Sequence, residues 1–357
     1  MQTTIRLAHP SAASRYPLAI QGSINWRRAE QTSAGDIARW QIDVALPELP
    51  AKHILIPSYA STAGAYQYQF VLFKSASEPS AVDSTSAVTG QTSTLYPVPD
   101  YQRTLAVWPD AQHNLSTMSS HIDCWHSEED SRGLVVRLIV ACEQPPTADL
   151  LTICVRELVL ATNSTDSSVD EQLAPLQAHS RLSKTPALAP FPLSQMTAAS
   201  DIAQRICSPT ALAMAMGCLR SDVSWQHTIE ACFDRHTKAY GKWPLAIYAA
   251  SQLGILAATE TFTDWSKPGY LLAKGHPIVC SIRFEKDQLE NAPLERTGGH
   301  LVLLYGIDFT GDAPIALVMD PAGSSPEEVP RRYALEQFTA AWLQHRGASY
   351  VLSRMLA

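Results

Sequence analysis

The sequence predicts an α+β protein with an N-terminal antiparallel β-sandwich and a C-terminal domain in which helices come before antiparallel strands. Three observations lead to this prediction. Residues 1–160 contain strand-length apolar runs, residues 161–190 change in composition, and residues 191–357 begin with helical patterns and end with strands. A chain of 357 residues is also long for one domain, so we expect each part to fold by itself.

The N-terminal strands are predicted from alternation and from β-branched residues. Residues 65–73, AYQYQFVLF, place Tyr66, Tyr68 and Phe70 on one side. Three more runs have strand length and composition, namely 39–46, 133–142 and 150–160. Clusters of Gly, Pro, Ser and Asp separate the runs and no helical period persists, which favours a sandwich.

The next stretch, 161–190, is rich in Ser, Thr, Ala and Pro and has few apolar residues. This composition is typical of a linker, or of an extended segment that wraps between domains.

Helices and then strands are predicted in the C-terminal part. Helical patterns cover 208–220, 227–241 and 243–254, the last with Pro near its start and Gly at its end. Apolar strand-like runs follow at 277–284, 300–307 and 315–320.

Charge and cysteine content exclude several function classes. The net charge is -7, from 27 Lys and Arg against 34 Asp and Glu, so we expect no nucleic-acid or acidic-membrane partner. No run of 18 apolar residues predicts a membrane span. The seven cysteines lack a CxxC pair and the N-terminus lacks a signal-peptide pattern, so we expect a reducing, cytoplasmic location.

Cys207 is the first candidate catalytic residue. It precedes Ser208 and Pro209, which together predict the N-cap and first residue of a helix. The positive end of a helix dipole stabilises a thiolate, which is what a sulfur nucleophile needs. Taken alone, a cysteine here is more often a small buried apolar residue.

His300 and Asp320 are the second and third candidates. The turn sequence 308–312 lies between two apolar runs, and a hairpin centred between Thr310 and Gly311 would place residue 300 opposite residue 320. Opposed residues of an antiparallel pair face the same side, about 4.5–5.5 Å apart. Asp320 could then orient the His300 ring and stabilise the imidazolium. A strand-end histidine and an Asp-Pro turn are the structural alternatives, and a one-residue slip would separate the pair.

The chain order Cys, His, Asp is that of papain-like enzymes, and several stretches carry a closer resemblance. They are SQM (194–196), CSPTALAMAMG (207–217), GKWP (241–244), GHPIVCSI (275–282), GGHLVLLYGID (298–308), MDPAG (319–323) and RRYALEQFTAAWL (331–343). Residues 190–357 thereby resemble bacterial cysteine peptidases of the bacteriocin-processing, double-glycine-leader-like group, in particular a stand-alone branch often preceded by a β-rich domain. Over 1–160, HIDCW (121–125) and the strand pattern are only suggestive of that branch.

The resemblance implies a papain-like fold, thiol-dependent amide hydrolysis, no cofactor and no metal. It also implies a glutamine upstream of the cysteine as oxyanion donor. Gln195 lies twelve residues before Cys207, farther than the family pattern, whereas Gln204 lies only three before it. We favour Gln195, with Gln204 or neither as the alternatives, and expect the Cys207 N–H to be the second donor.

Two further features could contribute to a functional site, a tryptophan and a cluster of His, Asp and Cys residues. Trp243 follows Gly241-Lys242 and could line a substrate cleft or fill the core. His121, Asp123, Cys124 and His126 have the composition of a metal site, but on a continuous strand they would face opposite sides, so we predict no metal.

The prediction is therefore a cysteine peptidase or amidase that cleaves a peptide or amide substrate through Cys207, His300 and Asp320. An acyltransferase with the same three residues and a catalytically silent binding protein of the same fold are the alternatives. The sandwich could dock a polymer or protein, although structural support is the favoured role. The sequence predicts neither the substrate side chains nor the oligomeric state.

Overall fold

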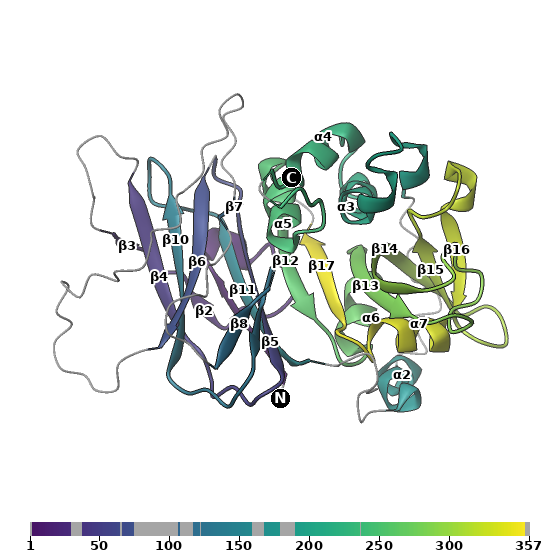
Figure 1. The fold of residues 1–357 in the computed structure, drawn as a ribbon, viewed down its shortest axis with the longest axis horizontal. Helices are drawn as coiled ribbons and strands as arrows, with labels where there is room; N and C mark the ends of the chain where they lie inside the picture. The colour runs from purple at the N-terminus through teal and green to yellow at the C-terminus, as the bar shows by residue number, and fades with distance from the viewer. Residues whose placement is uncertain are drawn as a thin grey trace.

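A computed structural model of the chain describes residues 2–29, 38–64, 66–74, 106–107, 117–121, 123–158, 168–178, 190–235 and 237–353. Its described strands form three sheets, two in the N-terminal half and one in the C-terminal half (Figure 1).

The first sheet has the strand order β2-β1-β11-β5-β9-β8, in which only the pairing of β1 with β2 is parallel. Its strands are β1 (Thr3–Ala8), β2 (Gly22–Ser23), β5 (His53–Ser61), β8 (Met118–Ser120), β9 (Trp125–Ser127) and β11 (Asp149–Glu157). A short helix, α1 (Pro10–Ala13), follows β1.

The second sheet has the order β3-β4-β10-β6-β7, in which only β6 and β7 pair in parallel. Its strands are β3 (Arg27–Arg28), β4 (Arg39–Ala45), β6 (Gln67–Lys74), β7 (Ala106–Val107) and β10 (Leu134–Ala141). The four strands predicted in the N-terminal half correspond to β4, β6 and β10 of this sheet and β11 of the first sheet, with bounds that agree to within a few residues.

The two N-terminal sheets share one hydrophobic core. Alternate residues of β6 and β10 are buried, as the alternation in their sequences predicts. Tyr68, Phe70 and Leu138 of the second sheet cluster with Leu55 and Leu151 of the first. Face-to-face burial of this kind explains why the polar residues of these strands point outward.

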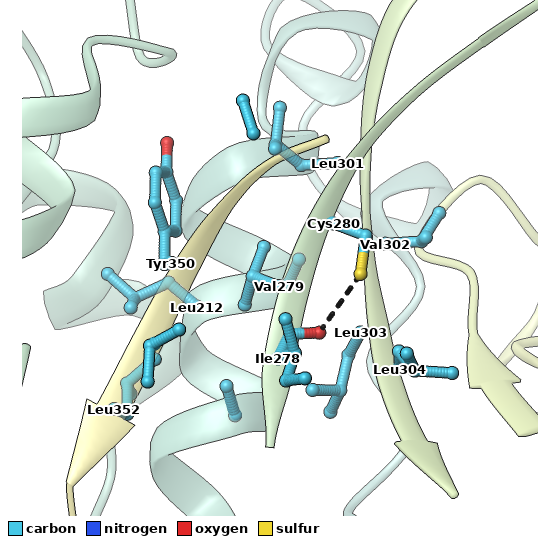
Figure 2. Packing of buried hydrophobic residues seen from close by; sticks show 14 of the residues in the cluster. Leu212, Ile278, Val279, Cys280, Leu301, Val302, Leu303, Leu304, Tyr350 and Leu352 are labelled. Atoms are coloured by element: carbon cyan, nitrogen blue, oxygen red, sulfur yellow. Dashed lines mark hydrogen bonds between the residues drawn. The ribbon is translucent and has the colours of Figure 1, made fainter. Parts of the chain in front are cut away.

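The third sheet is antiparallel throughout, with the order β12-β17-β13-β14-β15-β16. Its strands are β12 (Leu256–Thr261), β13 (Ile278–Phe284), β14 (Thr297–Asp308), β15 (Ile315–Met319), β16 (Pro330–Ala334) and β17 (Ala348–Ser353). Figure 2 shows the apolar packing on β13, β14 and β17, where Leu212 of a helix lies near Val279 and Tyr350.

The remaining helices belong to the C-terminal half or lie beside it. They are α2 (Val169–Ala178), α3 (Cys207–Gly217), α4 (Trp225–Ala231), α5 (Trp243–Gln252), α6 (Ser266–Ala273) and α7 (Leu335–Trp342), with short 3-10 turns at Gln195–Thr197, Ala203–Arg205 and Pro326–Glu328. In Figure 1, α3 and α4 lie toward the top of the C-terminal half, and α6 and α7 lie toward its lower edge.

Helix α5 lies against the N-terminal half and is buried along nearly its whole length. Every residue from 243 to 251 is buried, because α5 contacts both β5 and β12. The Tyr68 hydroxyl donates to the Pro244 carbonyl at 3.1 Å, and the Tyr66 and Ser251 hydroxyls lie 2.9 Å apart. A helix that is apolar all round needs partners on all sides, and the N-terminal half supplies one of them.

A second hydrophobic cluster spans both halves. This cluster contains Ile54, Leu150 and Cys154 of the first sheet together with Ala257 of β12 and Leu212 of α3. The C-terminal core therefore includes residues of the first sheet, and the expectation that each part folds by itself stays a prediction.

Two predicted elements differ in extent. The helix predicted over 227–241 ends at Ala231, because the Asp234 carboxylate accepts hydrogen bonds from the N–H and hydroxyl of Thr237 and closes a local turn instead. Within the predicted linker, α2 forms and buries Leu176. The rest of that linker, 161–167 and 179–189, lies outside the described residues.

Candidate active site

Cys207 is the first residue of α3 and is half-buried. The predicted N-cap is wrong by two residues: Ile206 occupies that position, and no side chain caps the helix. The Ser208 hydroxyl instead lies 3.0 Å from the Tyr350 hydroxyl of β17, a buried contact that competes with capping. The expected location of Cys207 at the positive end of the helix is nevertheless what the structure has.

The pKa of the Cys207 thiol is lowered, whereas every other cysteine whose pKa departs from the usual value has a raised pKa. Burial raises the pKa, but the hydrogen bond to His300, the charge of His300 and the N–H groups of Leu301 and Ser208 outweigh burial. Burial raises the pKa of Cys218 to about 12 and that of Cys142 to about 11. Cys207 therefore has the environment of a nucleophile, which the other two thiols lack.

His300 lies in β14 opposite Ile282 and is 3 % exposed. Its Nε2 is 2.7 Å from Asp320 Oδ1, which leaves Nδ1 for the Cys207 thiol. Burial lowers the pKa of His300, yet the charge and hydrogen bond of Asp320, together with Cys207, raise it to about 10. A low thiol pKa beside a high imidazole pKa favours a thiolate–imidazolium pair at neutral pH.

Asp320 follows β15 and is 1 % exposed. Its Oδ1 also accepts from the Ala322 N–H at 2.9 Å, and its Oδ2 accepts from the Tyr333 hydroxyl at 2.8 Å. Burial raises the pKa of this carboxyl, but the charge and hydrogen bond of His300 and the two further donors lower it below the usual value. The carboxylate is thus held ionised next to the imidazole ring.

The predicted register of the hairpin is wrong, although the two side chains meet. The ladder ends with Leu303 opposite Met319, so its continuation places residue 302, not His300, opposite Asp320. Asp308 pairs with Ile315, so the hairpin is centred between Gly311 and Asp312, one residue beyond the predicted centre.

A β-bulge restores the shared face. The register shifts by one residue between Leu304 and Gly306, which leaves Tyr305 as the extra residue. Without that shift, Leu303 would align with Asp320, and His300, three residues away, would face the other side of the sheet. With the shift, His300 is two residues from the position opposite Asp320 and shares its face.

The two candidate oxyanion glutamines differ in burial. Gln195 is 4 % exposed, its N–H donates to the carbonyl of Pro321 at 2.8 Å, and its Nε2 donates to the Ala203 carbonyl at 2.7 Å. Its Oε1 is buried and has no hydrogen-bond partner among the described residues. Gln204 is exposed. Gln195 is thus tied to the loop that follows Asp320, whereas the exposed Gln204 directs its Nε2 at the Met196 sulfur, 3.9 Å away.

Trp243 begins α5 and is buried, with its ring edge-on to Tyr350 at 6.0 Å between centroids. These are core contacts and do not support the substrate-cleft role that the sequence left open.

The expected geometry around His121 is wrong, because the chain bends there instead of continuing as a strand. Strands β8 and β9 pair around this bend, and the rings of His121 and His126 stack with centroids 3.6 Å apart. The Asp123 carboxylate accepts from the Trp243 N–H at 3.2 Å and also makes a hydrogen bond with the Cys124 thiol. Across the described residues, no group of three or more His, Cys, Asp or Glu side chains is arranged to hold a metal ion.

Sequence reasoning missed two tyrosines that contact the site. Tyr333 of β16 donates to Asp320, and Tyr350 of β17 contacts Ser208, next to Cys207. Both are fully buried. Their spacing from the cysteine, histidine and aspartate carries no local signal, because sheet pairing alone brings them there.

The C-terminal half is similar in sequence to a family of known proteins. Residues 190–350 match the sequence model of the Peptidase_C39 like family. A crystal structure from Bacillus anthracis assigned to the C39-like peptidases is similar, with 16 % sequence identity and a TM-score of 0.35, over 47 % of this chain and 96 % of that one. The search of curated proteins gives no match. In the described part of the chain, no helix is long and apolar enough to cross a membrane.

Proposed function

We propose that the C-terminal half is a cysteine peptidase or amidase of papain-like arrangement, with Cys207 as nucleophile, His300 as base and Asp320 as the residue that orients the imidazole. The observation that carries the proposal is the His300 ring, which has Asp320 at Nε2 and the Cys207 thiol on its remaining side. The match of residues 190–350 to a peptidase family supports it.

The first half-reaction forms an acyl-enzyme. The Cys207 thiolate attacks the carbonyl carbon of the scissile amide, and a C–S bond forms as the carbonyl π electrons move to oxygen. The imidazolium of His300 then gives its Nδ1 proton to the leaving nitrogen while the C–N bond breaks. A thioester on Cys207 and a free amine result.

The second half-reaction releases the acid. Neutral His300 removes a proton from water, the water oxygen bonds to the thioester carbon, and the C–S bond breaks to restore the thiolate. In both halves the negative oxygen needs donors, and we assign the Cys207 N–H and the Gln195 side-chain amide to this role. Burial and the bonds to Pro321 and Ala203 fix the position of Gln195, and because one N–H of its Nε2 donates to Ala203, the other N–H is the one we assign to the oxyanion.

A peptide library with mass-spectrometric product detection tests the proposal. We expect cleavage by the native chain, none by Cys207→Ala, and full cleavage by the matched control Cys218→Ala, whose half-buried thiol lies at the far end of α3. Added amines separate the acyltransferase alternative, since amide products instead of free acids would reassign the reaction. Equal cleavage by Cys207→Ala would overturn the thiol mechanism.

We propose that the N-terminal half, which ends near residue 160, has a structural role. It supports the C-terminal half because its strands contact α5 and β12 over a shared core. All seven cysteines are free, which supports the proposal of a reducing, cytoplasmic location.

A further inference from the structure

Asp320 receives a hydrogen bond from a residue that is far from the cysteine and histidine in sequence. We propose that Tyr333 is a positioning residue for the hydrolysis, whose hydroxyl fixes the Asp320 carboxylate so that this carboxylate can hold the His300 ring. The inference rests on the proposed function, because it assigns Tyr333 a task in the same site.

The hydrogen bonds of the carboxylate divide between its two oxygens. Oδ1 accepts from the His300 ring at 2.7 Å and from the Ala322 N–H at 2.9 Å. Oδ2 accepts from the Tyr333 hydroxyl at 2.8 Å. Tyr333 therefore makes the bond that resists rotation of the carboxylate about its Cβ–Cγ bond from the side opposite His300.

The direction of this hydrogen bond is fixed. Tyr333 is fully buried, and burial together with the charge of Asp320 raises the pKa of the phenol far above its usual value. The pKa of Asp320 is lowered, so the pair stays as phenol and carboxylate. The phenol is consequently a donor across the working pH range of a thiol enzyme.

The ring of Tyr333 is held independently of its hydroxyl. It stacks on Phe338 of α7, with centroids 6.2 Å apart and planes 12° from parallel, and its backbone pairs with Ala316. A phenylalanine at 333 would keep this packing and remove only the donor, which makes the hydroxyl separable from the fold.

Without the donor, Oδ2 becomes a buried, unpaired carboxylate oxygen. The carboxylate would then rotate or shift to find other donors, and the N–H groups bound to Oδ1 would lose alignment. His300 would spend less time with Nδ1 directed at Cys207. We expect kcat to fall about 5–30-fold, with KM within about twofold, because a fully buried phenol does not touch the substrate.

The experiment is a double-mutant cycle with Tyr333→Phe, Asp320→Ala and the double variant, each assayed for kcat and KM. If Tyr333 acts through Asp320, Tyr333→Phe lowers kcat in the native background but changes it less than twofold in the Asp320→Ala background. The acid limb of the kcat/KM profile should also move to higher pH in Tyr333→Phe. A carboxylate that is held less firmly stabilises the His300 imidazolium less, so the pKa of the Cys207 thiol rises.

The matched control is Tyr16→Phe. Tyr16 is also buried and donates to a carboxylate at 2.8 Å, but that carboxylate is Glu260 of β12 and not Asp320. The kcat of the Tyr16→Phe variant should stay within twofold of the native value. Equal losses for Tyr333→Phe in both backgrounds, or no loss in the native background, would overturn the positioning role.

A substrate-independent readout separates failure of this inference from failure of the proposed function. The rate of Cys207 alkylation by iodoacetamide should fall in Tyr333→Phe near neutral pH, even if no peptide is cleaved. An unchanged rate refutes the role of Tyr333, whereas absent cleavage with a changed rate refutes only the proposed reaction.

Discussion

At the scale of single residues, the proposed hydrolysis depends on opposite pKa shifts in Cys207 and His300, whose side chains contact each other. The His300 imidazole has a pKa raised to about 10, while the pKa of the Cys207 thiol is lowered. A thiolate–imidazolium pair therefore exists above the thiol pKa and below the imidazole pKa. We expect kcat/KM to rise with pH through the first and to fall through the second, near pH 10.

Removal of the His300 imidazole and removal of the Asp320 carboxylate should have unequal effects on turnover. His300→Ala eliminates the base and the partner of the thiolate, so turnover should nearly vanish. Asp320→Ala should lower kcat about 10–1000-fold, less than the roughly 10⁴-fold loss seen when the tautomer of a serine triad is upset, because Cys207 and His300 already stabilise each other's charge. Steady-state kinetics of both variants measures this order, and native activity in Asp320→Ala would make the carboxylate purely structural.

The candidate residues were predictable from sequence, but their contacts were only partly so. Cys207 before a Ser-Pro helix start, and His300 and Asp320 at the ends of neighbouring apolar runs, carry local signals. Tyr333 carries none, because its contact with Asp320 depends on how β16 pairs with β15.

At the scale of elements, irregularities in the strands decide the geometry of the site. The bulge at Tyr305 sets which face His300 shares with Asp320, and a sequence pattern of period two does not locate such an insertion. The Ser- and Pro-rich composition of 161–190 also does not predict α2. The helix is stabilised by tertiary contacts, namely the burial of Leu176 and the hydrogen bond from the backbone N–H of Trp265 to the Gln172 carbonyl.

The turn after α7 contains Gly347, which is packed so closely that a side chain there should destabilise the fold. Gly347 has φ +55°, and a Cβ placed there would lie 1.9 Å from the carbonyl oxygen of Phe262 and 2.4 Å from the Arg156 guanidinium. Gly347→Ala should therefore lower the free energy of unfolding by about 3 kcal/mol or more, measured by urea denaturation. Gly217→Ala, with open space around its Cβ position, is the control and should be neutral or stabilising. A loss below about 1 kcal/mol at Gly347 would contradict this packing.

At the scale of the whole molecule, buried polar contacts tie the two halves together. Arg156 of β11 donates to the carbonyls of Phe262 and Leu343, and Arg6 of β1 makes two bonds of 2.7 Å to Glu260 of β12. The sequence predicted the content of each half, but not their shared core, because that core combines residues more than a hundred positions apart.

The Arg6–Glu260 pair predicts a specific pattern of stability. Both side chains are nearly fully buried, so Arg6→Met alone should cost about 3–5 kcal/mol by leaving the carboxylate without its cation. The double variant Arg6→Met/Glu260→Leu should recover most of that loss, since neither charge remains buried. Thermal and urea unfolding of the full chain measure both. Equal losses in the single and double variants would show that packing, and not an unpaired charge, explains the cost.

The thiolate–imidazolium pair of Cys207 and His300 is tested most directly by the pH dependence of Cys207 alkylation in the native chain. Peptide mapping after brief iodoacetamide treatment gives the rate for each cysteine. We expect Cys207 to react first, at a rate that is already high near neutral pH. His300→Ala should move the pH profile of Cys207 toward that of an ordinary thiol, while Cys218 stays unreactive. A Cys207 rate that follows an ordinary thiol in the native chain and is unchanged by His300→Ala would contradict the thiolate–imidazolium pair.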